Sequence, residues 1–390
     1  MTHSSSDSSS LSTSTASTSS TTTSSLVDSG PSTASSERRR EHMAAAFHLE
    51  EARGECTANT STAEAFFRPE ATNPGVYELT KLFIGLVTLV PLRVVLIVLL
   101  ILPYYLVARL VVCFPPTHFG KSFLEHMTRG VSRTVLFLCG FHWLHVRGAP
   151  EEDSTRVPII VSNHVSFVEV LFFMSMHHPP AFVFKQECLK LPVIGKIARD
   201  VLGSVPVDHA HRGTGATETI VKLVHRMQAD ETGVRPRQLL IFPEGTTTNG
   251  TCLIRFRTGA FVAGVPVQPV VVRLPFRHFS PTYESIYTWV FVLRMLSQFH
   301  NRLDAEFLPA YVPSDEERRD PHVYADNVRT AMALHADLGF CCEVSFKDKM
   351  AYHKILDRQF HTCHLPAFLA KLVYVHPTPS GRPSVEPNAR

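Results

Sequence analysis

The sequence predicts an α/β fold, with a largely parallel sheet and flanking helices preceded by an N-terminal hydrophobic membrane-anchoring helix or helical hairpin. Short β-rich runs alternate with helical patterns after Pro116, and such alternation is typical of parallel sheets. Before this region, one apolar segment has the length that a membrane requires. With 390 residues, 44% of them apolar, the chain can bury a substantial core.

The first 36 residues contain 25 Ser or Thr and almost no apolar side chains. Such a segment cannot bury enough apolar surface to offset its chain entropy, so we expect it to be disordered. It lacks a basic start followed by an apolar core, so we do not expect a cleavable signal peptide. Residues 37–75 have the composition of a linker.

The apolar segment Leu82–Ala108 contains one charge, Arg93, and two prolines, Pro91 and Pro103. A straight membrane span needs about 20 apolar residues. Two arrangements satisfy the backbone: one tilted helix with Arg93 near the membrane interface, or two short helices that bend at a proline and dip into one leaflet. Both predict membrane attachment. Basic residues flank both ends of the segment, so charge gives no orientation.

After Pro116, strand-like and helical segments follow one another. The predicted strands are 157–162, 181–185, 204–208, 238–242, 266–273 and 304–312. Helical periodicity marks 216–229 and 324–338. The predicted organisation is a disordered Ser/Thr-rich tail and linker at 1–75, a membrane-anchoring segment at 76–116, the main domain at 117–340, and a C-terminal extension with a Pro-rich tail at 341–390.

Charge and cysteine patterns argue against several kinds of function. The net charge is +3, without a basic stripe interleaved with aromatics, so no nucleic-acid partner is expected. Eight cysteines are scattered without regular spacing, which suggests buried free thiols in a reducing compartment. The segment "HTCH" at 361–364 lacks a second cluster, so no metal site is expected.

The stretch "NHVSFVE" (163–169) follows a predicted strand, so Asn163 and His164 lie where open α/β sheets usually bind ligands. Two interpretations fit it. In the first, "SFVE" is a capping box, with Ser166 as N-cap and Glu169 bonding back to the cap N–H. In the second, Glu169 accepts a hydrogen bond from one ring nitrogen of His164 and leaves the other nitrogen as a base.

The stretch "LLIFPEGTTTNG" (239–250) is an apolar strand that ends in a loop with one carboxylate, a glycine and hydroxyl groups. Such a loop can hold an oxyanion, a phosphate or a diol, with Glu244 orienting a hydroxyl. An ordinary turn is the alternative. Between the two loops, Lys185 and other basic residues among apolar ones suit an anionic amphiphile, or are surface cations.

Four blocks in order resemble the signature of the glycerolipid acyltransferases, the superfamily of lysophosphatidate and glycerol-3-phosphate acyltransferases. They are "NHVSFVE" (163–169), the Lys-rich and Gly-containing segment 184–209, "FPEGTTTNG" (242–250) and "GVPVQPVVVR" (264–273). In detail the chain looks most like lysophosphatidylcholine and lysophosphatidylethanolamine acyltransferases of the plant type. The resemblance identifies 117–340 as an acyltransferase catalytic domain.

The chain departs from that signature at three positions. Glu169 stands where most members have Asp, which moves the carboxylate one methylene outward. Thr247 replaces an Arg common in lysophosphatidate enzymes, which removes a natural partner for a dianionic phosphate. His209 replaces the Arg usual at the end of the second block, which puts that role in doubt.

The resemblance implies transfer of a fatty acyl group from acyl-CoA to a lysophospholipid hydroxyl, without a covalent acyl-enzyme. His164 would be the general base and Glu169 its orienting carboxylate. The implied substrate-binding residues are Asn163, which could also steady the thioester oxyanion, Lys185, Glu244, Gly245, Thr246, Thr247 and Arg255, or Arg257 in place of Arg255. No cofactor or metal is implied, since acyl-CoA is a co-substrate. The implied location is the endoplasmic reticulum membrane, with the site facing the cytosol.

Three other functions remain open at this point. The same chemistry on lysophosphatidate or glycerol 3-phosphate is one, and a CoA-independent transacylase is the second. The third, from another class, is a catalytically silent lipid-binding protein of the membrane. Head-group preference, acyl-chain preference and oligomeric state are also left open by the sequence.

Overall fold

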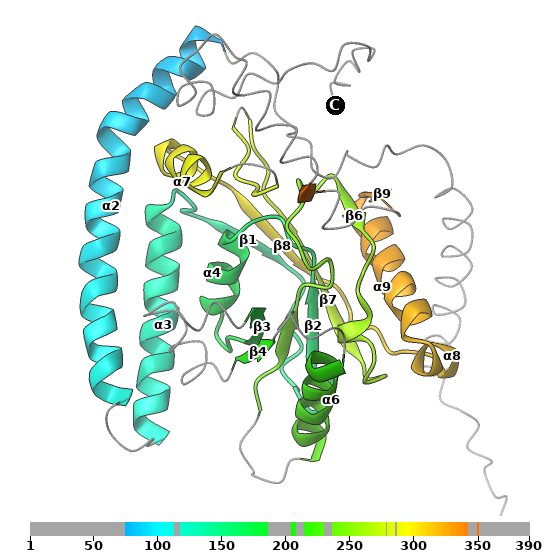
Figure 1. Cartoon of the computed structure of the whole chain (residues 1–390). Helices are drawn as coiled ribbons and strands as arrows, with labels where there is room; N and C mark the ends of the chain where they lie inside the picture. The colour runs from blue at the N-terminus through cyan, green and yellow to red at the C-terminus, as the bar shows by residue number, and fades with distance from the viewer. Residues whose placement is uncertain are drawn as a thin grey trace, which may run out of the picture. The chain divides into compact units, whose positions relative to one another are not determined.

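The computed structural model describes residues 75–112, 118–185, 204–207, 214–229, 236–277, 279–284, 287–341 and 349–350 (Figure 1). The tail and linker expected before residue 75 lie outside the described residues. So do the middle of the second sequence block, the position of His209 and the "HTCH" segment.

The predicted, largely parallel sheet is confirmed. Its seven strands lie in the order β1 (Leu144–Arg147), β8 (Leu303–Phe307), β7 (Val267–Arg273), β2 (Ile159–Ser162), β5 (Leu239–Ile241), β3 (Ala181–Lys185) and β4 (Val205–Val207). Neighbours are parallel except β7 and β8, which are antiparallel. All six predicted strands are present, whereas β1 and a separate pair of short strands, β6 (Cys252–Ile254) and β9 (Gly339–Cys341), were not predicted.

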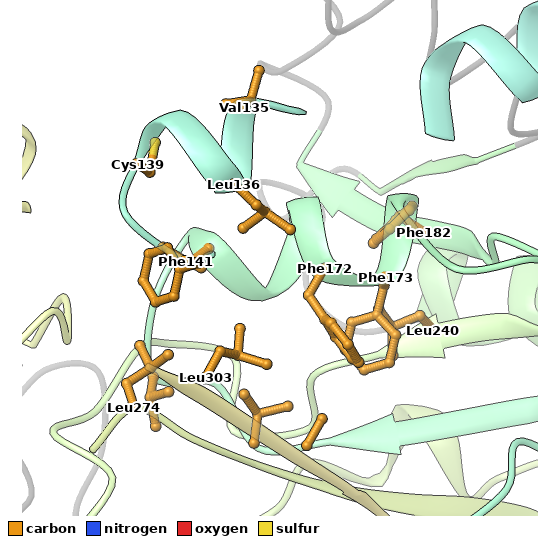
Figure 2. Close-up of a cluster of buried hydrophobic side chains, with 14 of the residues drawn as sticks. Val135, Leu136, Cys139, Phe141, Phe172, Phe173, Phe182, Leu240, Leu274 and Leu303 are labelled. Carbon is orange, nitrogen blue, oxygen red and sulfur yellow. The ribbon is translucent and has the colours of Figure 1, made fainter. Parts of the chain in front are cut away.

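Helices cover both faces of the sheet, and the strand residues alternate between two apolar cores. Ile160 of β2 faces the core formed with α3 (His118–Leu138), α4 (Val168–Met174) and α7 (Thr288–Ser297). In this core Phe172 and Phe173 of α4 point toward Leu240 of β5 (Figure 2).

The residues on either side of Ile160 face the opposite core. Ile159 and Val161 pack there with α6 (Thr214–Ala229) and α9 (Pro321–Ala336). A short helix, α8 (Asp315–Arg319), precedes α9. Because β2 is buried on both faces, its position is fixed from both sides, and the loop that follows it starts from a rigid support.

The apolar segment forms one continuous helix, α2 (Val76–Val112), with Pro91 and Pro103 inside it. The alternative of two short helices is therefore wrong. By length and composition α2 can cross a membrane. Large apolar side chains such as Leu99 and Leu106 are exposed along it.

One side of α2 packs against the rest of the domain. It lies beside α3 (Figure 1), where Tyr104 bonds Thr128 through their hydroxyls at 2.6 Å. The guanidinium of Arg93 is buried and donates to the carbonyl oxygens of Leu296 and Gln298, at 2.7 and 2.6 Å. The charge of Arg93 is satisfied by the carboxyl end of α7, and its place near a membrane interface stays a prediction.

Candidate active site

Three loops meet at one edge of the sheet. β7, β2 and β5 are neighbouring parallel strands, so their carboxyl ends lie side by side. The loop after β2 carries His164, the loop after β5 carries Glu244, and the loop after β7 carries Tyr283. This edge is where open α/β sheets usually hold their ligands.

His164 and Glu169 form the pair that the second interpretation predicted. Nδ1 of His164 lies 2.8 Å from Oε2 of Glu169. The Glu169 side chain is fully buried, whereas that of His164 is 17% exposed and its ring stacks on Phe242, with centroids 4.2 Å apart. Because Nδ1 faces a carboxylate, Nε2 is the nitrogen left to act as a base.

Glu169 also serves the start of the helix. Its Oε1 accepts hydrogen bonds from the backbone N–H groups of Val165 and Ser166, at 2.5 and 2.7 Å. The second of these is the Glu half of the predicted capping box. The N-cap itself is Phe167 rather than Ser166, whose hydroxyl donates to the carbonyl oxygen of Pro281 at 3.0 Å. The two interpretations are thus compatible, since one carboxylate makes both sets of contacts.

Glu244 joins the loop after β5 to the loop of His164. Its Oε1 accepts a hydrogen bond from the backbone N–H of His164 at 2.8 Å. In return, the N–H of Thr248 donates to the carbonyl oxygen of His164 at 2.9 Å. This loop therefore holds both the N–H and the carbonyl oxygen of His164. These contacts fix the backbone of the residue without a hydrogen bond to its imidazole ring.

The carboxyl group of Glu244 is fully buried, and burial raises its pKa to about 8. This net value also includes the negative charge of Glu169, which raises the pKa, and the N–H groups of His164 and Ile254 and the ammonium of Lys349, which lower it. Oε2 of Glu244 makes no hydrogen bond to any residue in the described ranges. At neutral pH Glu244 is therefore mostly protonated and carries no charge.

Asn163 joins the loop after β2 to β7. Its side chain is buried, Nδ2 donates to the carbonyl oxygen of Val272 at 2.9 Å, and Oδ1 accepts the N–H of Val272 at 2.7 Å. The amide thus bonds the backbone of β7 as a neighbouring strand would. The amide therefore has a structural role through both of its polar atoms, and its part in substrate binding stays a prediction.

The other predicted binding residues lie on or near the loop after β5, except Arg255, which follows β6, and Lys185, which ends β3. Gly245 has a left-handed φ of +66°, and a Cβ there would lie 2.6 Å from Nε of Arg257. The arginine beside Gly245 is therefore Arg257, and both Arg255 and Arg257 are exposed. Thr246 and Thr247 are buried in the same loop. Lys185 ends β3 at this edge of the sheet, but its side chain lies outside the described part of the chain.

Sequence reasoning missed one residue of this region. Lys349, from the C-terminal extension, donates to the carbonyl oxygen and to Oγ1 of Thr247, both at 2.7 Å. The extension carries no recognisable motif around this lysine, so no local signal marked it.

Two buried cysteines, Cys139 and Cys252, differ in their covalent state. Cys139 is a buried free thiol, and burial raises its pKa to about 11. Cys252 is disulfide-bonded, which corrects the expectation of free thiols at that position. Within the described ranges, no group of His, Cys, Asp and Glu is arranged to hold a metal ion.

Known proteins are similar to this chain over most of its length. A family model described as Acyltransferase matches residues 146–273. The chain is 34% identical to the lysophospholipid acyltransferase LPEAT1 of Arabidopsis thaliana, over 72% of this chain and 83% of that protein. It is 32% identical to LPEAT2 of the same plant, over 79% of this chain and 60% of the relative. It is 33% identical to lysophosphatidylcholine acyltransferase 1 of Danio rerio, over 75% and 58%.

These similarities agree with the class that fold and site define, an α/β enzyme with a His and carboxylate pair at the carboxyl edge of its sheet. The chain belongs to the acyltransferase family, among its lysophospholipid acyltransferases. It spans less than two thirds of the length of two of the relatives described above.

Proposed function

We propose that this enzyme transfers a fatty acyl group from acyl-CoA to the free hydroxyl of lysophosphatidylcholine or lysophosphatidylethanolamine, with His164 as general base. The contact between Nδ1 of His164 and Glu169 carries the proposal, because it fixes the ring and directs Nε2 outward. The names of the relatives, which specify lysophospholipid and lysophosphatidylcholine acyltransferases, support the class of acceptor.

A hydroxyl is a weak nucleophile at neutral pH, so it must lose its proton as it attacks the thioester carbon. Nε2 of His164 takes that proton, and the carboxylate of Glu169 stabilises the resulting imidazolium. The new C–O ester bond forms, the C–S bond breaks, and the departing CoA sulfur receives the proton back from His164. The products are a phospholipid and free CoA, and no acyl group is attached to the protein.

The loop after β5 binds the glycerol phosphate of the acceptor in this proposal. Because protonated Glu244 is neutral, it adds no second negative charge to that of Glu169, and the loop can accept an anionic phosphate. Gly245 leaves room for the guanidinium of Arg257, which supplies a cation for the phosphate. Lys185 joins this set because β3 ends at the same edge of the sheet.

The exposed apolar side of α2 is proposed to attach the enzyme to the bilayer, where both substrates partition. The double variant Leu99→Asp/Leu106→Asp should float less with phosphatidylcholine vesicles than the unchanged chain does. The variant Leu334→Asp, at an exposed leucine of α9, is the matched control and should float as the unchanged chain does. Equal flotation of all three proteins would contradict attachment through α2.

The proposed cellular location is the endoplasmic reticulum membrane, with the site facing the cytosol. A tag at each end of the chain, tested by protease protection of intact microsomes, checks the orientation. Protection of the domain that carries His164 would contradict it.

A panel of acceptors tests the proposed reaction. Purified chain receives labelled acyl-CoA with lysophosphatidylcholine, lysophosphatidylethanolamine, lysophosphatidate or glycerol 3-phosphate, and both phospholipid and free CoA are measured. We expect one of the first two acceptors to be used fastest, with one CoA released for each ester formed. Preference for lysophosphatidate or glycerol 3-phosphate, or ester formation without CoA release, would contradict the proposal.

A further inference from the structure

Lys349 is a buried lysine of the C-terminal extension that contacts the loop after β5. Its side chain is only 5% exposed. The hydrogen bonds from Nζ to the carbonyl oxygen and Oγ1 of Thr247 replace water around the ammonium. Burying an ammonium is costly unless such partners are present. The extension therefore brings a positive charge into the loop that also holds Glu244.

The same ammonium reaches the loop after β7. Nζ lies 3.5 Å from the carbonyl oxygen of Tyr283 and 5.8 Å from the centroid of its ring. The N–H of Tyr283 donates to the carbonyl oxygen of Val165 at 2.8 Å, and the N–H of Thr248 donates to that of His164. Lys349 thus contacts both of these loops. The loops in turn donate hydrogen bonds to the carbonyl oxygens of two consecutive residues, His164 and Val165.

We propose that Lys349 is a positioning residue of the acyl-transfer site, which clamps the loops after β5 and β7 around His164 and places a positive charge near the buried carboxyl group of Glu244. This inference rests on the proposed function. It extends the site past residue 341, beyond the 146–273 segment matched by the family model and beyond the domain end predicted at residue 340.

The charge of Lys349 gives this role a signature that packing alone lacks. Among the described residues, the titratable and charged side chains around Glu244 are those of His164, Glu169 and Lys349. Arg257 lies beside the neighbouring Gly245. Because the ammonium lowers the pKa of Glu244, a neutral side chain at position 349 raises that pKa. Glu244 then stays protonated to a higher pH, and any property that depends on its proton moves in the same direction.

Three variants of the full chain test the inference: Lys349→Met, Lys349→Arg and the control Lys222→Met. Lys222 is an exposed lysine whose Nζ pairs with Glu218 at 2.6 Å on α6. Acyl transfer to the preferred lysophospholipid is measured from pH 6 to pH 10, which gives kcat/KM and the pH at which the KM for the acceptor begins to rise. Amide hydrogen exchange of Thr248 and Tyr283 is measured in the same proteins without substrate.

We expect Lys349→Met to lower kcat/KM roughly 100-fold, as a small displacement of a catalytic base can. In this variant the rise of KM should move to higher pH, and the Thr248 and Tyr283 amides should exchange faster. Lys349→Arg should recover part of kcat/KM, while Lys222→Met should behave as the unchanged chain. Normal kcat/KM in Lys349→Met, or lost activity with an unmoved pH profile and unchanged exchange, would overturn the inference.

The proposed function and the clamp can fail separately. If the unchanged chain transfers no acyl group from acyl-CoA to any acceptor, the proposed function falls. Hydrogen exchange then tests the proposed clamp without an activity measurement. Faster exchange at Thr248 and Tyr283 in Lys349→Met supports the clamp, and unchanged exchange overturns it.

Discussion

Oε2 of Glu169 lies 2.8 Å from Nδ1 of His164, while Oε1 of the same carboxylate accepts the backbone N–H groups of Val165 and Ser166. The ring and the start of α4 are thus held by one side chain. The two oxygens have separate tasks, so a substitution that changes only one of them separates orientation of the ring from support of the helix.

Glu169→Gln makes that separation. The two N–H groups require an oxygen at Oε1, so the amide nitrogen faces Nδ1 of His164. Nδ1 must then accept, which places the ring proton on Nε2, where it blocks removal of the substrate proton. We expect acyl transfer to fall by roughly 10²–10⁴-fold. The free energy of unfolding should change by less than about 1 kcal/mol, because the helix contacts remain.

The two effects of Glu169→Gln are measured by the initial rate of acyl transfer and by thermal unfolding in the same detergent. If the melting temperature falls by many degrees while the folded fraction keeps its rate, Glu169 supports the helix and not the base.

Asn163→Ala should destabilise the protein without removing a catalytic group. The substitution leaves the N–H and the carbonyl oxygen of Val272 buried without their partner. We expect a loss of roughly 2–4 kcal/mol in the free energy of unfolding. The specific activity of the folded fraction should stay within tenfold of normal. Normal stability with activity lost by several orders of magnitude would show that Asn163 acts on the substrate instead.

Gly245→Ala should weaken binding of the acceptor. A Cβ at this left-handed position is strained, and it would lie 2.6 Å from Nε of Arg257, so the guanidinium must move. We expect the KM for the lysophospholipid to rise by about tenfold, which corresponds to roughly 1.4 kcal/mol. Gly259→Ala is the matched control, since a Cβ there meets nothing within 4 Å. Equal KM values for the two variants would contradict the role given to this loop.

The pKa of Glu244 predicts how stability depends on pH. Its folded pKa of about 8 is raised above the ordinary value of 4.5 because the carboxyl group is buried. Between these two values the folded chain binds a proton that the unfolded chain has lost. The stabilisation is therefore complete below about pH 4.5, and it is lost as pH rises toward 8.

Glu244→Gln removes this dependence because the amide does not titrate. Thermal unfolding from pH 5 to pH 9 should show the unchanged chain losing stability on the order of a few kcal/mol relative to Glu244→Gln. Parallel curves for the two proteins would show that Glu244 titrates normally.

The strands around the site were predictable because buried parallel strands leave continuous apolar runs, as in the segment that became β2. The contact of His164 with Glu169 was predictable from their separation, since a loop residue and the first helical turn lie close in space. β1 was missed because "LHVR" is mostly exposed or half-buried and has no apolar run.

The remaining differences depend on contacts that are distant in the sequence. Asn163 has an amide suited equally to substrate or backbone, and its contacts with Val272, 109 residues away, have no local signal in the sequence. The partners of Arg93 could not be predicted, because its guanidinium bonds carbonyl oxygens more than 200 residues later in the chain. Lys349 reaches Thr247 across 102 residues, and no local pattern encodes that approach.

The most direct measurement compares acyl transfer by the unchanged chain and by His164→Ala, using labelled acyl-CoA and the preferred lysophospholipid in vesicles. His322→Ala, at an exposed histidine of α9, is the control for loss of an imidazole. If His164 is the general base, its removal lowers the rate by roughly 10²–10⁴-fold while vesicle binding and melting temperature stay normal, and His322→Ala is fully active. A rate for His164→Ala equal to that of the unchanged chain would contradict the central claim.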